Sequence, residues 1–126
     1  MKGQCMCGAV RFSVDPAAMI KAYHCHCEDC RRACSAPFTT WMRVRDTGFR
    51  WTSGRPVMRE SAPGVRRGFC GACGSPMSYA SDDAPGEADL YVVALDDPEA
   101  VAPEYHEFWS ERLAWVSVTD DLPKKD

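Results

Sequence analysis

The sequence predicts a mainly β fold in a single domain that spans residues 1–126. The chain has 126 residues, of which 45% are hydrophobic and 26% charged, and a chain of this size and composition can bury one modest core. Its apolar residues form short runs between turn residues rather than long amphipathic helices. We therefore expect short antiparallel strands with one or two short helical turns.

Six runs alternate apolar with polar residues or are rich in β-branched and aromatic residues, which favours strands. Turn dipeptides such as Ser53-Gly54, Pro63-Gly64 and Pro85-Gly86 lie between the runs and supply the φ angles that tight turns need. The expected strands are residues 9–14, 38–44, 49–52, 57–61, 77–80 and 90–95. A short helix is expected at residues 27–34, where Pro37 helps to end it, and a second helical turn at 97–101.

The N-terminus contains no apolar stretch of the kind that a secretory signal needs. The longest apolar run, residues 90–95, is far shorter than the roughly 20 residues that span a bilayer. We expect a cytoplasmic protein with no membrane partner. In that reducing compartment, regularly spaced thiols are more often metal ligands or catalytic groups than disulfides.

Charge is distributed unevenly along the chain, although the net charge is only -3. Residues 1–81 carry twelve basic and five acidic side chains, whereas residues 82–126 carry three and thirteen. Such asymmetry indicates either nucleic-acid binding by the basic part or two segments that lie against each other. We favour the second interpretation and expect no nucleic-acid partner, because the arginines between positions 43 and 67 are dispersed and have few interleaved surface aromatics.

Seven of the eight cysteines fall into three groups. Two groups are close pairs, Cys5 with Cys7 and Cys70 with Cys73, and two such pairs brought together make a closed four-thiolate zinc site. Residues 69–74 resemble a zinc knuckle, in which a glycine after the second cysteine, here Gly74, lets the backbone turn toward the sulfurs. We interpret these four cysteines as a structural site.

The third group, Cys25, Cys27 and Cys30, supplies three thiolates and leaves one zinc position open, which is typical of a catalytic site. Cys34, His24 or His26 could instead provide a fourth ligand and make a second structural site. Alternatively, Cys34 packs as a small hydrophobic residue. His26 points away from its flanking cysteines if the segment is extended.

The donor set constrains the chemistry. Three thiolates leave a Zn(II) centre with a net negative charge, so a water bound there is poorly acidified and hydrolysis is disfavoured. A thiolate-rich metal suits a further sulfur ligand and would hold a substrate thiol as a nucleophilic thiolate. The sequence therefore predicts a thiol substrate.

The residues also resemble a known family. Residues 4–12 (QCMCGAVRF), 24–32 (HCHCEDCRR), 36–38 (APF), 69–76 (FCGACGSP) and the stretch 105–123 are similar to the glutathione-dependent formaldehyde-activating enzymes, a family that also contains centromere protein V. The resemblance covers essentially the whole chain.

This resemblance implies a β-tent of short antiparallel sheets around a structural zinc, and two zinc ions per chain, of which the second can be labile. The implied ligands are Cys5, Cys7, Cys70 and Cys73 for the structural zinc and Cys25, Cys27 and Cys30 for the catalytic zinc. The implied activity is that of a carbon–sulfur lyase, which reversibly joins formaldehyde and glutathione to S-hydroxymethylglutathione. The expected partners are therefore a small thiol such as glutathione and a small aldehyde.

Further residues near the second group are candidates for the reaction. His24 or His26 could protonate the developing hemithioacetal oxygen, with a solvent-facing histidine as the alternative. Arg31 and Arg32 could hold a glutathione carboxylate, with a solvated helix face as the alternative. Two other functions stay open: a zinc-stabilised binding module for protein or nucleic acid with two structural sites, and a redox or zinc-storage role for the second group.

Overall fold

The computed structural model describes residues 1–126 and confirms the mainly β fold class, with one α-helix and short 3-10 turns. The strands and helix are β1 (Lys2–Gln4), β2 (Arg11–Val14), β3 (Met19–Cys25), α1 (Glu28–Cys34), β4 (Thr39–Arg45), β5 (Phe49–Ser53), β6 (Val57–Ala62), β7 (Val65–Phe69), β8 (Pro76–Ser81), β9 (Glu87–Tyr91) and β10 (His106–Glu107). The 3-10 turns are Pro16–Ala18, Asp46–Gly48, Val92–Ala94, Pro98–Ala100 and Trp109–Glu111.

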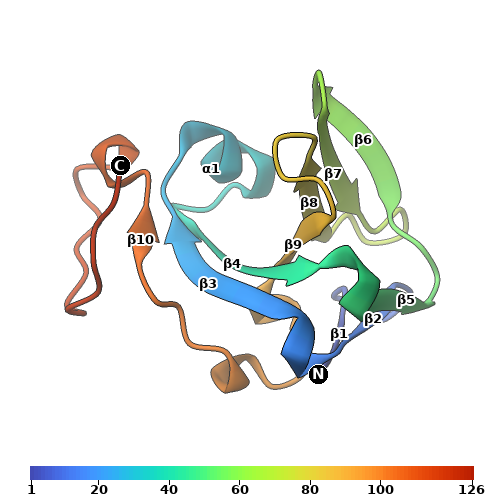
Figure 1. Cartoon of the computed structure of the whole chain (residues 1–126). Coiled ribbons are helices and arrows are strands. Elements are labelled where there is room, and N and C mark those ends of the chain that lie inside the picture. The colour runs from blue at the N-terminus through green and yellow to red at the C-terminus, as the bar shows by residue number, and fades with distance from the viewer.

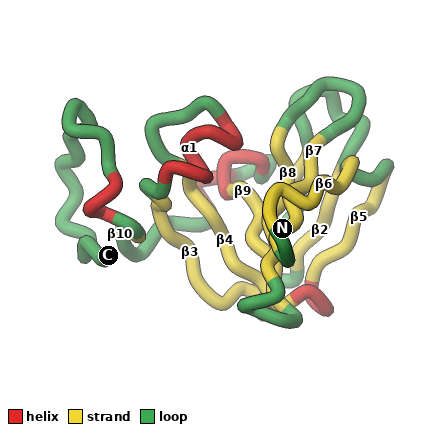
Figure 2. The backbone as a smooth tube through the Cα atoms, turned by 90° about the horizontal axis from the view of Figure 1, so that it is seen from above, coloured by secondary structure: helices red, strands yellow, loops and turns green.

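The strands form two sheets. A three-stranded sheet has the order β1-β2-β5, and a seven-stranded sheet has the order β10-β3-β4-β9-β8-β7-β6. All pairings are antiparallel except that of β10 with β3. In Figure 1 the β6–β7 hairpin rises at one end of the larger sheet, and α1 lies above β3 and β4, to the left of the hairpin. Figure 2 shows the same arrangement from above, with β10 and the C-terminal segment beyond β3.

Two groups of buried side chains form the core. The larger lies between the sheets and includes Phe12, Met42 and Leu90, together with the cysteines Cys5 and Cys70. The smaller is largely aromatic: it contains Tyr23, Trp41, Tyr91 and Tyr105, and the cysteines Cys25 and Cys30 pack in it. Burial of this apolar area supplies most of the folding free energy. Each cysteine cluster is therefore anchored in a different part of the core.

Most predicted elements are confirmed within a few residues. Five of the six predicted strands correspond to β2, β4, β5, β6 and β8. The helix predicted at 27–34 is α1, and Cys27 precedes it as the N-cap. The second helical turn is the 3-10 turn Pro98–Ala100. The sequence analysis did not identify the strands β1, β3, β7 and β10.

The strand predicted at residues 90–95 is confirmed only at Leu90 and Tyr91 and is wrong beyond them. β9 ends at Tyr91, and Val92–Ala94 form a 3-10 turn in which the Leu95 amide donates a hydrogen bond to the Val92 carbonyl at 3.0 Å. Val92 and Leu95 are both buried in the larger core group. A short apolar run has no periodicity that separates a buried strand from a buried turn, and this run contains both.

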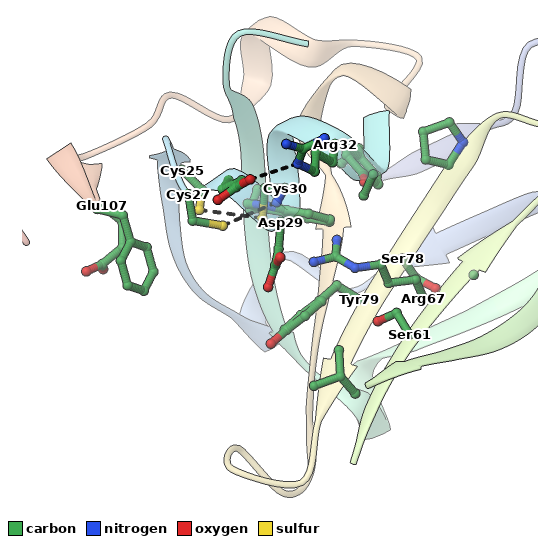
Figure 3. Close-up of a pocket in the computed structure, with 18 of the residues that line it drawn as sticks. Cys25, Cys27, Asp29, Cys30, Arg32, Ser61, Arg67, Ser78, Tyr79 and Glu107 are labelled. Carbon is green, nitrogen blue, oxygen red and sulfur yellow. Dashed lines mark hydrogen bonds and ion pairs between the residues drawn. The ribbon is translucent and has the colours of Figure 1, made fainter. Parts of the chain in front are cut away.

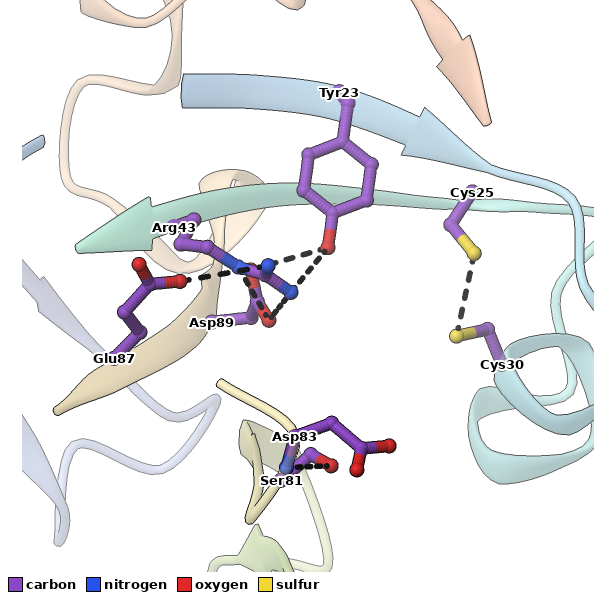
Figure 4. A network of polar contacts seen from close by, with 8 residues as sticks. All are labelled: Tyr23, Cys25, Cys30, Arg43, Ser81, Asp83, Glu87 and Asp89. Carbon is purple, nitrogen blue, oxygen red and sulfur yellow. Dashed lines mark hydrogen bonds and ion pairs between the residues drawn. The ribbon is translucent and has the colours of Figure 1, made fainter. Parts of the chain in front are cut away.

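The oppositely charged parts of the chain lie against each other, which confirms the favoured interpretation of the charge asymmetry. The Arg43 guanidinium on β4 contacts the carboxylates of Asp89 at 2.8 Å and Glu87 at 3.5 Å, both on the neighbouring strand β9. The Tyr23 hydroxyl completes this network by donating to Asp89 at 3.1 Å (Figure 4). No helix of the structure has the length and apolarity needed to cross a membrane.

Candidate active site and metal centres

The four paired cysteines converge on one point, as the sequence predicts. The sulfurs of Cys5, Cys7, Cys70 and Cys73 all lie within 4.8 Å of one another. The Cys5 and Cys7 sulfurs are 3.6 Å apart, and those of Cys7 and Cys70 are 3.9 Å apart. Four sulfurs bound tetrahedrally to zinc at about 2.3 Å would be separated by about 3.8 Å. The cluster therefore has the donor set and the spacing of a closed four-thiolate zinc site.

Two matching turns form this cluster. After Cys7 and Cys73 the chain passes through Gly8 and Gly74, with φ angles of 77° and 78°. The Gly8 amide donates to the Cys5 carbonyl at 3.1 Å, and the Gly74 amide donates to the Cys70 carbonyl at 2.8 Å. A residue with a Cβ adopts such φ values only at a cost, so glycine suits both positions. The role predicted for Gly74 is confirmed, and Gly8 has the same role in the other turn.

Hydrogen bonds to two of the four sulfurs, those of Cys5 and Cys73, favour their thiolate forms. The Val10 amide donates to the Cys5 sulfur at 3.3 Å, in the buried half of the site. In the exposed half, the Ser75 hydroxyl lies 3.1 Å from the Cys73 sulfur, and hydrogen bonds from the Ser75 side chain and backbone lower the pKa of Cys73 to about 5. A metal binds the thiolate form, so both contacts favour metal binding at neutral pH.

The three remaining predicted ligands also converge. The sulfurs of Cys25, Cys27 and Cys30 lie within 4.8 Å of one another, and the Cys25 and Cys30 sulfurs are 3.6 Å apart. Cys25 ends β3, Cys27 is the N-cap of α1, and Cys30 lies in the first turn of α1, where its amide donates to the Cys27 sulfur at 3.3 Å. This spacing fits three vertices of a tetrahedral zinc site.

No further cysteine, histidine or carboxylate joins this three-cysteine cluster. The Cys34 thiol instead donates to the Cys30 carbonyl at 3.0 Å and lies 3.3 Å from the Tyr91 hydroxyl. His24 is 2.9 Å from the Thr40 hydroxyl through its Nδ1 atom. The structure therefore places neither Cys34 nor His24 in the position of a fourth ligand.

The interpretation of His26 as a solvent-facing residue is wrong, because its exposed fraction is 0%. Its Nε2 atom lies 2.8 Å from Nδ1 of His106, and His106 Nε2 lies 3.0 Å from both oxygens of Asp120. A carboxylate only accepts hydrogen bonds, so His106 Nε2 donates to Asp120. Burial, together with the neighbouring imidazoles, lowers the pKa of His26 to about 4. His26 lies outside the cavity described below.

The three-cysteine cluster forms one wall of a cavity of about 1020 Å³ between α1, β3 and the strands β6 to β8 (Figure 3). Aromatic side chains line its floor and sides, among them Tyr23, Trp41, Tyr79 and Tyr91. Basic side chains surround it, and acidic side chains from α1 and the C-terminal segment reach its edge. The basic lining residues are Lys21, Arg32, Arg43, Arg59 and Arg67. This polarity suits an anionic ligand with an apolar part.

Arg31 and Arg32, both predicted to hold a substrate carboxylate, have different surroundings in the structure. Arg32 lines the cavity and forms an ion pair with Glu28 at 2.8 Å, although its side chain is 78% exposed. Arg31 does not line the cavity and donates to the carbonyls of His26 at 3.3 Å and Glu111 at 3.4 Å. Only Arg32 is therefore placed to contact a ligand, whereas Arg31 fastens the loop that carries the cysteines.

Sequence reasoning did not identify Arg67 as a site residue. Arg67 lies on β7, lines the cavity and stacks over the Tyr79 ring, with 4.9 Å between the guanidinium carbon and the ring centroid. The Cys25 and Cys27 thiols donate hydrogen bonds that lower the pKa of Cys30, and the neighbouring Arg67 guanidinium lowers it as well. The next residue, Arg66, extends to the other face of β7 and pairs with Asp82 at 2.8 Å.

Comparison with known proteins agrees with this geometry. The family described as glutathione-dependent formaldehyde-activating enzyme matches residues 1–111. A solved structure of a Rhodobacter sphaeroides protein is similar with a TM-score of 0.64 and 25% identity, over 76% of this chain and 88% of that chain. No protein with a curated description matches. The chain belongs to the glutathione-dependent formaldehyde-activating enzyme family.

Proposed function

We propose that the protein is a carbon–sulfur lyase that reversibly joins a small aldehyde, such as formaldehyde, to the sulfur of glutathione or a related thiol. One observation carries this proposal: three cysteine sulfurs with zinc-like spacing lie on the wall of a large cavity, and no further protein ligand joins them. A site with three protein ligands and access from a cavity has room for a substrate atom.

We assign a structural zinc to Cys5, Cys7, Cys70 and Cys73, and a second zinc to Cys25, Cys27 and Cys30. When bound by these three cysteines, the second zinc would supply a soft Lewis-acidic centre that favours the thiolate form of a substrate thiol at neutral pH. The three cysteines orient that centre, because β3 and the first turn of α1 fix their positions. The reducing cytoplasm, where we place the protein, contains thiols such as glutathione and keeps the cysteines free.

The basic lining of the cavity supports a glutathione-like substrate, which carries two carboxylates and one ammonium group. We propose that Arg32 and the exposed Arg59 contact these carboxylates at the edge of the cavity. Arg31 holds the cysteine loop through the His26 carbonyl and does not bind substrate. The cavity volume of about 1020 Å³ is at the upper end of the range usual for small-molecule sites.

We assign no proton transfer to His26. It lies outside the cavity, its Nε2 atom is bound to His106, and it stays neutral because burial lowers its pKa to about 4. His26 lies between two of the proposed ligand cysteines, and its contact with His106, which is bound to Asp120, connects their loop to the C-terminal segment.

The proposal is tested by exchange spectroscopy, since formaldehyde and thiols also combine without a catalyst. We expect the zinc-loaded protein to raise the rate at which ¹³C-formaldehyde exchanges between its free form and its glutathione adduct, measured by two-dimensional exchange NMR at equilibrium. The folded Cys27→Ser variant should leave the rate at its uncatalysed value. Equal rates with and without the wild-type protein would contradict the proposal.

A further inference from the structure

We propose that Arg67 is a catalytic residue: its guanidinium binds the aldehyde oxygen and stabilises the negative charge that develops there when the carbon–sulfur bond forms. This inference rests on the proposed lyase function. It identifies the group that stabilises the aldehyde oxygen. The histidines are not candidates for this role, because none of them lines the cavity.

The first support is position. Arg67 lies in the middle of β7, paired with Arg59 on β6 and with Tyr79 on β8. Figure 3 shows its side chain extending from the strand wall of the cavity toward Cys30 and Asp29 on the opposite wall. Arg67 and the three cysteines Cys25, Cys27 and Cys30 all line this cavity. A thiol substrate held beside Cys25, Cys27 and Cys30 would therefore present its sulfur near Arg67.

The second support is an unused donor. The Nη1 atom of Arg67 is fully buried and has no hydrogen-bond partner in the structure. Buried N–H groups are nearly always paired in folded proteins, so an orphaned nitrogen on a guanidinium that lines the cavity indicates that this side chain turns to an acceptor when a ligand is bound. An oxygen that becomes negatively charged is the acceptor that a guanidinium binds most strongly.

The other basic residues of the cavity do not combine burial with an unused donor. Arg43 is bound to Asp89 and Glu87, and Arg32 is bound to Glu28. Arg59 is exposed, so water solvates its side chain. The Lys21 ammonium lies over the rings of Tyr23 and Tyr105 and is not a buried unpaired donor. Arg67 forms no ion pair with a carboxylate, and its guanidinium lies over the Tyr79 ring in a cation–π contact. It is thus a preorganised donor in a partly desolvated place, where such donors contribute most to catalysis.

The chemical step balances with Arg67 acting only as a donor. The substrate thiol releases its proton to water when it binds. Its sulfur electron pair then forms the bond to the aldehyde carbon, and the carbonyl π electrons move to oxygen. Arg67 donates hydrogen bonds to this oxygen and keeps its protons, because guanidinium is too weak an acid to transfer one near neutral pH. The oxygen takes a proton from water, and the reverse reaction returns it.

The neighbouring Arg66 provides a matched control for the test, since it has the same charge but lies on the other face of β7 with Asp82. We expect Arg67→Met to lower the enzyme-dependent exchange rate by about 100-fold or more, the size found when an oxyanion donor is removed. Arg67→Lys should retain part of the rate, and Arg66→Met should retain all of it. Zinc content and glutathione affinity should stay unchanged in every variant.

A second measurement tests the oxygen site without turnover. Thioacetate carries an oxygen on the carbon bonded to sulfur, as the adduct does, whereas ethanethiol lacks that oxygen. In the cobalt-substituted protein, titrations followed by the thiolate-to-metal absorption should give a ratio of thioacetate to ethanethiol affinity. We expect this ratio to fall about tenfold or more in Arg67→Met and to be unaltered in Arg66→Met, because comparing variants cancels the different acidities of the two thiols.

The outcomes separate the two proposals. An exchange rate or affinity ratio that is the same in Arg67→Met and Arg66→Met would overturn the role of Arg67, and so would loss of the second zinc from Arg67→Met, because it would show that Arg67 only supports Cys30. If the wild-type protein does not accelerate exchange but its thioacetate preference depends on Arg67, the lyase function fails and the oxygen-binding site stands.

Discussion

The two cysteine clusters differ in how the chain builds them. The four-cysteine cluster joins Cys5 and Cys7 to Cys70 and Cys73, and so links two segments far apart in the sequence. The three-cysteine cluster lies within a single loop and helix turn, residues 25–30. The structural site is not the more buried of the two. Cys7 and Cys73 in the four-cysteine cluster are exposed, whereas Cys25 and Cys30 in the three-cysteine cluster are buried.

The clusters therefore differ in the number of their ligands and in how far apart these ligands lie in the sequence, and not in a simple way in burial. A metal that joins distant segments stabilises the fold directly, since the unfolded chain has no preformed site. A metal held within one short segment contributes little to tertiary structure. Its ligands can instead be backed by core aromatics on one side and face a cavity on the other. The proposed roles of the two metals follow from this difference.

The largest effect is expected from breaking the four-cysteine cluster. Cys73 is exposed, so Cys73→Ser removes a metal ligand without disturbing the core. Structural zinc contributes on the order of 10 kcal/mol, which is comparable to the whole stability of a small domain. We expect Cys73→Ser to unfold the protein, as measured by near-ultraviolet circular dichroism. Cys27→Ser should stay folded and contain one zinc.

Equal loss of structure in Cys73→Ser and Cys27→Ser would contradict this division. A Cys73→Ser protein that remains folded after losing its zinc would also contradict it, because the metal would then not hold the two segments together.

The two close cysteine pairs and the group at residues 25–30 could be predicted because their spacing is local information, whereas the contact between the two distant pairs is not set by spacing. Pairs such as Cys70 and Cys73 are brought close by one turn, whichever tertiary structure surrounds them. The alternation of apolar and polar residues in 9–14 and 49–52 likewise predicts a strand, whichever strand it pairs with. The strand β7 was missed because its run is short and has two adjacent arginines in its middle.

Arg67, His106 and Asp120 could not be predicted as site neighbours for a different reason. Each reaches its place through a sheet register or a crossing of distant segments: β7 carries Arg67, and the parallel pairing of β10 with β3 brings His106 beside His24. No spacing rule in one sequence specifies such contacts. In the sequence, Arg66 and Arg67 belong to the dispersed arginines between positions 43 and 67, whereas as neighbours on β7 they lie on opposite faces of the strand.

A smaller effect is expected from the glycine turns. Gly74 and Gly86 have nearly equal φ angles of 78° and 77°, and neither has an atom within 4 Å of an added Cβ. Alanine at either position should cost about 1 kcal/mol through backbone strain. Only Gly74→Ala should also weaken zinc binding at the four-cysteine cluster, measured by competition with a chromophoric chelator. Equal zinc affinities in the two variants would show that the turn after Cys73 does not shape the site.

The smallest effect is expected at Cys34. Its thiol contacts the Cys30 carbonyl and the Tyr91 hydroxyl but is not part of the metal cluster. Cys34→Ser keeps a donor at this position and should change the free energy of unfolding by about 1 kcal/mol or less. Zinc content, measured by atomic emission, should stay the same. Loss of the second zinc from Cys34→Ser would identify Cys34 as a ligand and close the site.

The most direct test of the open three-cysteine site is a crystal structure of the zinc-loaded protein soaked with glutathione. We expect one zinc bound by the sulfurs of Cys5, Cys7, Cys70 and Cys73, and a second bound by Cys25, Cys27, Cys30 and the glutathione sulfur. A second zinc with four ligands from the protein, or glutathione bound away from it, would contradict the account.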